Sequence, residues 1–177
     1  MIKTINSKLV YKNRWMEVKE DKVEFSNGQK GVYGVVKKDD FALIIPFDGT
    51  HFYMVKQYRY PIKKDSLEFP QGKHEDDPDI TPEILAKAEL EEETGLTSSD
   101  IKSIGHLCVA PGYSNQGFHI FLAKRLTQGK QHLEETEHGL EVERITLKEF
   151  EELTKKGVIV DSPTLAAYSL LKVQDLI

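Results

Sequence analysis

The sequence predicts an α+β protein in which a mixed β-sheet lies between helices. Polar and apolar side chains alternate through most of the first sixty residues, which is typical of half-buried strands. Segments with clear helix start and stop residues follow, separated by further strand-like stretches. Because strands come first and helices appear later between strands, this order favours a mixed sheet covered by helices.

Four strands are predicted in the N-terminal part, and we expect them to form an antiparallel β-meander. Asn27 and Gly28 mark a tight turn after the first of them. The predicted strands are WMEVKEDKVEF (residues 15–25), GVYGVV (31–36), FALIIPF (41–47) and HFYMVKQY (51–58).

A loop and then a helix are predicted next. Residues 66–80 contain two prolines, a glycine and several acids, which is typical of a loop. Thr81 suits the N-cap and Pro82 the first helical position. The helix should run to about Thr94, because Gly95 suits the left-handed residue that ends a helix.

The rest of the chain predicts two strands and two helices, at residues 101–109, 118–123, 147–156 and 164–176. Thr146 and Glu149 fit a capping box at the start of the first of these helices, and Gly157 closes it. Ser162 and Pro163 open the last helix.

Size and charge limit the class of protein. The chain has 177 residues, 39% hydrophobic and 30% charged, which fits one globular domain. It contains no apolar run long enough to span a membrane and no signal-peptide core, so we expect a cytoplasmic protein without a membrane partner. A net charge of -5 argues against a nucleic-acid partner, and an anionic substrate would need a bridging cation.

The single cysteine, Cys108, lies in the apolar stretch IGHLCVAP. One cysteine cannot form an internal disulfide, and an apolar setting is typical of a buried thiol. We therefore expect Cys108 to be structural and assign it no chemistry.

Residues 86–96, AKAELEEETGL, place four glutamates just before the predicted helix stop: Glu89, Glu91, Glu92 and Glu93. The helix dipole is negative at that end, so each carboxylate costs about 0.3–1 kcal/mol there. Only a cation or basic partners would offset this cost. The stretch is therefore either a solvated acidic face or a metal site.

Helical spacing separates these glutamates. Glu89, Glu92 and Glu93 share one face, because residues i, i+3 and i+4 are neighbours, whereas Glu91 points away. Three convergent carboxylates offer hard oxygen ligands, which suit Mg²⁺ or Mn²⁺ rather than Zn²⁺.

The stretch from Gly72 to Leu96, GKHEDDPDITPEILAKAELEEETGL, resembles the signature of the Nudix hydrolases, which closes on E-L-x-E-E-x-G-hydrophobic. The resemblance implies an α/β/α sandwich and hydrolysis of a diphosphate linked to another group. It also implies that Glu89, Glu92 and Glu93 are catalytic metal ligands, with the carbonyl of Gly72 as a fourth.

The stretch departs from the family pattern in two places. Ala88 stands where the motif has an arginine, and the loop after Gly72 is two residues longer than usual. The loop glutamate of the family has no certain counterpart, since Ile80 falls at its spacing and Asp77 or Asp79 lies nearby. The arginine commonly supports a ligand glutamate, so its absence bears on the rate more than on the metal site.

Further segments resemble the ADP-ribose pyrophosphatase branch of the family: VKQYRYP, LEFPQGK and APGYSNQGFHIFLA. Pro111, fifteen residues after Leu96, occupies the place of a proline that marks this branch. The chain is thus expected to be one Nudix domain over residues 1–177, with an N-terminal strand region at 1–38 and a catalytic core at 39–177. The resemblance also implies a homodimer.

Several residues outside the glutamate cluster are candidates for substrate binding. Arg59 offers a rigid fork for a diphosphate, or else pairs with a neighbouring acid. Glu68 would bind metal through water or hold a ribose hydroxyl, or is a simple loop carboxylate. Trp15 and Tyr33 either pack on strands or, as the resemblance implies, stack on adenine across a dimer interface.

The segment around Pro111 adds two expectations. Pro111 and Gln116 are candidate substrate contacts. The branch commonly has an acid after Pro-Gly, whereas this chain has Ser114, Asn115 and Gln116 there, so the contacts are expected to differ.

The general base is expected in the segment HLEETEHGLEVERI, because the ADP-ribose branch takes its base from this region. Glu135, Glu137 and Glu141 are candidates, and we select Glu137. The favoured function is Mg²⁺-dependent hydrolysis of ADP-ribose or a related nucleoside diphosphate sugar. Because of Ala88, a non-catalytic nucleotide-sugar-binding domain remains the alternative.

Overall fold

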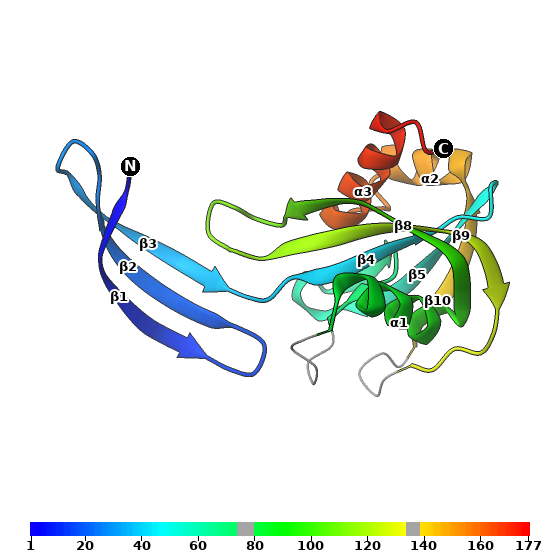
Figure 1. The fold of residues 1–177 in the computed structure, drawn as a ribbon, viewed down its shortest axis with the longest axis horizontal. Helices are drawn as coiled ribbons and strands as arrows, with labels where there is room; N and C mark the ends of the chain where they lie inside the picture. The colour runs from blue at the N-terminus through cyan, green and yellow to red at the C-terminus, as the bar shows by residue number, and fades with distance from the viewer. Residues whose placement is uncertain (74–79, 134–138) are drawn as a thin grey trace. The chain divides into compact units, whose positions relative to one another are not determined.

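The computed structural model describes residues 1–73, 80–133 and 139–177 (Figure 1). Its internal contacts divide the chain into two compact units. The N-terminal unit contains Met1–Asp40 and Cys108–Gly117, and the core unit contains Phe41–Leu107 and Phe118–Ile177. The expected division of one domain into residues 1–38 and 39–177 stays a prediction.

The N-terminal unit holds an antiparallel sheet in the order β1-β2-β3. Its strands are β1 (Lys3–Lys12), β2 (Glu17–Glu24) and β3 (Lys30–Lys37). The predicted meander is confirmed for this sheet. Strand β1 was not predicted, because all ten of its residues are exposed and no buried face gives it a recognisable pattern.

The first sheet of the core unit has the order β7-β4-β9-β8. Its strands are β4 (Phe41–Pro46), β7 (Gln71–Gly72), β8 (Leu96–Cys108) and β9 (Gly117–Gln128). Strand β4 runs parallel to β9, so the prediction that it continues the meander is wrong. The reason is its burial on both faces, which is typical of a parallel strand inside a sandwich.

The second sheet of the core unit has the order β10-β5-β6. It consists of β5 (His51–Arg59), β6 (Lys64–Glu68) and β10 (Glu141–Thr146), with the short 3₁₀ helix η1 (Tyr60–Ile62) between β5 and β6. The end of β6 and all of β7 fall within residues 66–80. The prediction of a continuous loop there is therefore wrong, because residues 66–68 pair with β5 and residues 71 and 72 pair with β4.

Three helices complete the core unit: α1 (Pro82–Thr94), α2 (Leu147–Lys155) and α3 (Ser162–Val173). Strand β4 contributes to two hydrophobic core clusters. Ala42 and Ile44 pack with residues of α1, whereas Leu43 and Ile45 pack with residues of α2 and α3. Figure 1 shows α1 on one side of the sheet and α2 and α3 on the other. This is the expected α/β/α sandwich.

Strand alternation also corrects one expectation. Leu107 packs against the core cluster, and Cys108, the next residue of β8, is exposed. The prediction of a buried thiol is wrong, because successive residues of a strand point to opposite faces. Within the described ranges, no helix is both long and apolar enough to cross a membrane.

Candidate active site

Helix α1 has the boundaries that its sequence predicts. The Thr81 hydroxyl accepts the Ile84 N–H at 3.4 Å, and Pro82 follows the N-cap. Gly95 ends the helix in the left-handed region with φ of 69° and donates its N–H to the Glu91 carbonyl at 2.8 Å. Thr81 and Gly95 thus set the two ends of α1, and the ends set the direction in which each glutamate side chain of its last turns points.

The glutamates of α1 differ sharply in exposure. Glu89 is 7% exposed and Glu93 2% exposed, Glu92 is half-buried, and Glu91 is exposed. This order agrees with the helical face that the sequence predicts. A buried carboxylate is costly unless it is paired or binds a cation. The ligand roles of Glu89, Glu92 and Glu93 stay predictions.

The strand β7 lies directly against this face of α1. A Cβ atom built on Gly72 would lie 2.6 Å from Oε1 of Glu89, so glycine leaves the space that this carboxylate fills. The backbone N–H of Gln71 donates to Oε2 of Glu93 at 3.0 Å. Residues 71 and 72 thus place backbone groups beside two of the three predicted ligands.

The carbonyls at the end of α1 accept hydrogen bonds from residues 131 and 132, a contact that the sequence does not predict. Gln131 donates its side-chain Nε2 to the Glu93 carbonyl at 2.6 Å, and the His132 N–H donates to the Glu92 carbonyl at 3.0 Å. These donors reduce the negative end charge of the helix. They therefore lower the cost of the carboxylates at this end of the helix.

Arg59 pairs with Glu68, the alternative that the sequence had left open. Arg59 Nε donates to Glu68 Oε1 at 3.0 Å, and Nη2 donates to Oε2. Burial raises the pKa of Glu68, but the hydrogen bonds and charge of Arg59 outweigh it and hold that pKa below its usual value. Glu68 is therefore an ionised, buried carboxylate. The substrate roles of both residues remain predictions.

Two further polar residues of this region were missed. Gln71 donates its amide to both Glu68 and Asp161, and Asp161 caps α3. Burial raises the pKa of Asp161, and the charge of Glu68 adds to this effect. Aspartate just before Ser162-Pro163 is a recognisable N-cap, but nothing in the local sequence indicates its contact with Gln71.

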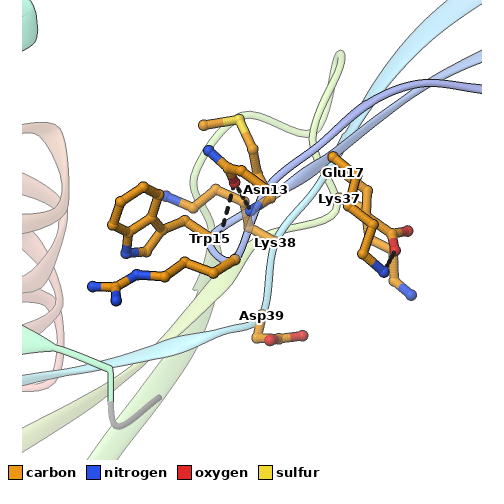
Figure 2. Close-up of a pocket in the computed structure, with 9 residues that line it drawn as sticks. Asn13, Trp15, Glu17, Lys37, Lys38 and Asp39 are labelled. Atoms are coloured by element: carbon orange, nitrogen blue, oxygen red, sulfur yellow. Dashed lines mark hydrogen bonds and ion pairs between the residues drawn. The ribbon is translucent and has the colours of Figure 1, made fainter.

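Trp15 lies in the turn between β1 and β2, so the expectation that it sits on a strand is wrong. The Asn13 side chain accepts the N–H groups of Trp15 and Met16, which makes a turn of this segment. Arg14 lies over the Trp15 ring at 4.4 Å. Trp15, Lys37 and Lys38 line a pocket of about 190 Å³. Figure 2 shows these side chains.

The remaining candidates of the N-terminal unit are placed as follows. Tyr33 lies on β3 opposite Asp21 and is 38% exposed. Pro111 is exposed in a turn. Gln116 donates its side-chain amide to the Asp39 carbonyl at 2.9 Å. Their substrate contacts stay predictions.

The candidates for general base fall partly outside the described residues. Glu135 and the selected Glu137 lie there, as do Asp77 and Asp79 of the long loop. Glu141 is described: it is exposed on β10 opposite Lys56 of β5. Ile80 is half-buried and packs against the cluster beneath α1.

The donor set of α1 fits a hard divalent cation. Glu89, Glu92 and Glu93 offer carboxylate oxygens only, and the space beside Glu89 would be filled by any side chain at position 72. Such oxygen ligands suit Mg²⁺ or Mn²⁺.

Comparison with protein families finds a match for each of two parts of the chain. Residues 2–36 match the family described as nucleoside diphosphate sugar hydrolase N-terminal domain, and residues 37–168 match the NUDIX domain.

Two curated relatives and one solved structure are similar over nearly the whole chain. An ADP-ribose pyrophosphatase of Bacillus subtilis (strain 168) and a methanol dehydrogenase activator of Bacillus methanolicus are each 31% identical over 176 residues, covering 98% of this chain and 94% of the relative. The crystal structure of an ADP compounds hydrolase has a TM-score of 0.86 at 23% identity and covers 99% of this chain and 97% of its own. That structural likeness supports the fold.

Proposed function

Since the chain belongs to the Nudix hydrolase family, we propose that it hydrolyses the diphosphate bond of ADP-ribose or a related nucleoside diphosphate sugar. Water attacks one phosphorus and the bridging P–O bond breaks, which gives a nucleoside monophosphate and a sugar phosphate. The observation that carries the proposal is the burial of Glu89 and Glu93 on the face of α1 that contacts β7. The match of residues 2–36 to a nucleoside diphosphate sugar hydrolase domain supports this substrate class.

The proposed cofactor is Mg²⁺, with Mn²⁺ as a substitute, held by Glu89, Glu92, Glu93 and the carbonyl of Gly72. A bound ion would supply charge neutralisation for the diphosphate and a lower pKa for the attacking water. The chain itself contributes the prearranged carboxylates, because the Gln71 N–H fixes one oxygen of Glu93. Among the candidate bases, Glu137 takes the proton of the water in this proposal.

The substrate groups are assigned to residues outside α1. In this proposal Arg59, whose side chain is 38% exposed, binds the diphosphate through its guanidinium while Glu68 holds its orientation. Trp15 and Tyr33 provide aromatic surface for the nucleobase of the substrate. Pro111 and Gln116 shape the segment that begins with the turn at Pro111.

A non-catalytic nucleotide-sugar-binding domain is the second candidate, and Ala88 is the observation that favours it. Lys87 does not replace the missing arginine, because its ammonium pairs with Glu83 at 2.7 Å on the exposed face. Support from β7 takes its place in this proposal, because the Gln71 N–H donates to Glu93 and Gly72 leaves space for Glu89.

A substrate panel separates the two candidates. Wild-type protein and Ala88→Arg are assayed with ADP-ribose, ADP-glucose and GDP-mannose in the presence of Mg²⁺. Release of nucleoside monophosphate by the wild type is the expected result. Inactivity rescued by Ala88→Arg indicates a decayed site. Inactivity of both, with tight nucleotide-sugar binding by calorimetry, contradicts the enzyme proposal in favour of the binder.

We also propose that the protein is a cytoplasmic homodimer that joins through the N-terminal sheet. Of residues 1–40, all of which the structure describes, Val23 alone is buried. Apolar side chains such as Ile5, Leu9 and Val10 are 50–59% exposed. Apolar side chains left exposed along a whole sheet commonly mark a protein interface.

A further inference from the structure

Gln71 connects three acidic side chains that come from three separate elements. Its backbone N–H donates to Oε2 of Glu93 on α1 at 3.0 Å. Its side-chain Nε2 donates to Oε2 of Glu68 at the end of β6 at 2.9 Å, and to Oδ2 of Asp161 at 3.2 Å. The same residue therefore contacts a predicted metal ligand through its backbone and the start of α3 through its side chain.

One carboxylate oxygen of Asp161 accepts two hydrogen bonds. Oδ2 accepts the Thr164 N–H at 2.8 Å, which caps α3, and it also accepts the Gln71 amide. Capping alone needs only a short polar side chain, such as serine. The longer aspartate is required for the second contact, which spans ninety positions of the chain.

The first turn of α3 holds the segment before Gly72 at a second point. The Phe69 N–H donates to the hydroxyl of Thr164 at 3.0 Å, and Thr164 is fully buried. The Ile44 N–H of β4 also donates to the Pro70 carbonyl at 2.9 Å. Residues 69–71 are thus fixed between α3 and β4, directly before the glycine that lies against Glu89.

We propose that Asp161 is a positioning residue for the acidic site on α1. By holding the Gln71 side chain, it sets the place of the Gln71 N–H beside Glu93 and of Gly72 beside Glu89. It acts through Gln71 and β7 and does not itself contact the reacting groups. The inference rests on the proposed metal-binding function of this site.

Three variants separate positioning from capping. Asp161→Ser retains a good N-cap but is too short to reach Gln71. Asp161→Asn retains an oxygen acceptor at the same length and serves as the conservative rescue. Gln71→Ala removes the amide while it keeps the backbone N–H. Thr146→Ala, which removes the hydroxyl cap of α2, is the matched control for loss of a cap alone.

The primary measurement is Mg²⁺ affinity by calorimetry, with unfolding followed by circular dichroism. Asp161→Ser and Gln71→Ala should each weaken Mg²⁺ binding about 10–100-fold, as loss of support for a ligand does. Asp161→Asn should stay within about 3-fold of wild type, because both hydrogen bonds keep an acceptor. Thr146→Ala should lower the melting temperature without changing Mg²⁺ affinity.

A double variant tests whether the two residues act in one chain of contacts. Asp161→Ser combined with Gln71→Ala should lose no more Mg²⁺ affinity than either single change. Additive losses, or wild-type affinity in a folded Asp161→Ser protein, overturn the proposal. If Asp161→Ser does not fold, wild-type affinity of Gln71→Ala has the same meaning.

Turnover of ADP-ribose is measured on the same proteins to separate this inference from the proposed function. If the wild-type protein binds Mg²⁺ but hydrolyses no substrate of the panel, the proposed hydrolase function is overturned. The Mg²⁺ affinities of the variants then still decide the role of Asp161. Wild-type protein that binds no Mg²⁺ overturns both.

Discussion

At the scale of single residues, the difference between Glu91 and its neighbours is the sharpest test of the site. Glu93→Gln and Glu92→Gln should each lower turnover by about 100-fold or more, because an uncharged amide is a weaker ligand and several kcal/mol of charge stabilisation are lost. Glu91→Gln should change turnover little, since Glu91 is exposed. Steady-state assays at saturating Mg²⁺ measure the turnover of each variant. Equal losses in all three variants would contradict the prediction that Glu92 and Glu93, but not Glu91, lie on the metal-binding face of α1.

Gly72 allows a second residue-level test. Gly72→Ala places a Cβ 2.6 Å from Oε1 of Glu89, and the end of this flexible side chain can move away. The protein should therefore keep its melting temperature while Mg²⁺ affinity falls about 10–100-fold. Gly34→Ala is the control, because no atom lies within 4 Å of a Cβ at Gly34. Unchanged Mg²⁺ affinity in Gly72→Ala would show that the place of Glu89 is not important.

At the scale of secondary-structure elements, Asp48 joins the turn between β4 and β5 to β10. Its Oδ1 accepts the N–H groups of Thr50 and His51 at 2.9 and 2.8 Å, and its Oδ2 accepts from Arg144 Nη2 at 2.6 Å. Burial raises the pKa of Asp48, but Arg144 and the turn N–H groups outweigh it, so the pKa lies well below its usual value. Ionised Asp48 therefore stabilises the fold.

The sign of this shift gives a prediction about pH. A lowered pKa contributes stability that is fully present above the unfolded value of about 3.9 and is lost as the pH falls through the folded value. Asp48→Asn should cost about 1 kcal/mol at pH 7, since the partner Arg144 is half exposed. Urea unfolding should show that the difference from wild type shrinks below about pH 4. A difference that stays constant down to pH 2 would contradict the role of the charge.

At the scale of the whole molecule, the exposed apolar surface of the N-terminal sheet predicts self-association. A three-stranded sheet needs a covered hydrophobic face for independent stability, and within residues 1–40 only Val23 is buried. Leu9→Lys, on β1, should shift the protein from twice the monomer mass to the monomer mass in light scattering. Val173→Lys changes a side chain that is 75% exposed on α3 and should leave the mass unchanged. A wild-type monomer at micromolar concentration would refute the dimer.

Features that depend on residues within about four positions of one another could be predicted from the sequence. The caps of α1, the separation of Glu91 from Glu93 and the capping box of α2 follow from helical spacing and local hydrogen bonds. The fold class also followed, because the Nudix signature and the order of elements were both visible.

Features that depend on partners far apart in the chain could not be predicted, because they form only when the core packs. The pairing of β4 with β9 and the contact of Gln71 with Asp161 join segments whose local sequences do not indicate one another. Cys108 is exposed for the same reason, since the face to which a strand residue points is set by the packing of the sheet. Helix ends are local, whereas strand partners and buried polar contacts are chosen by the packing of the whole core.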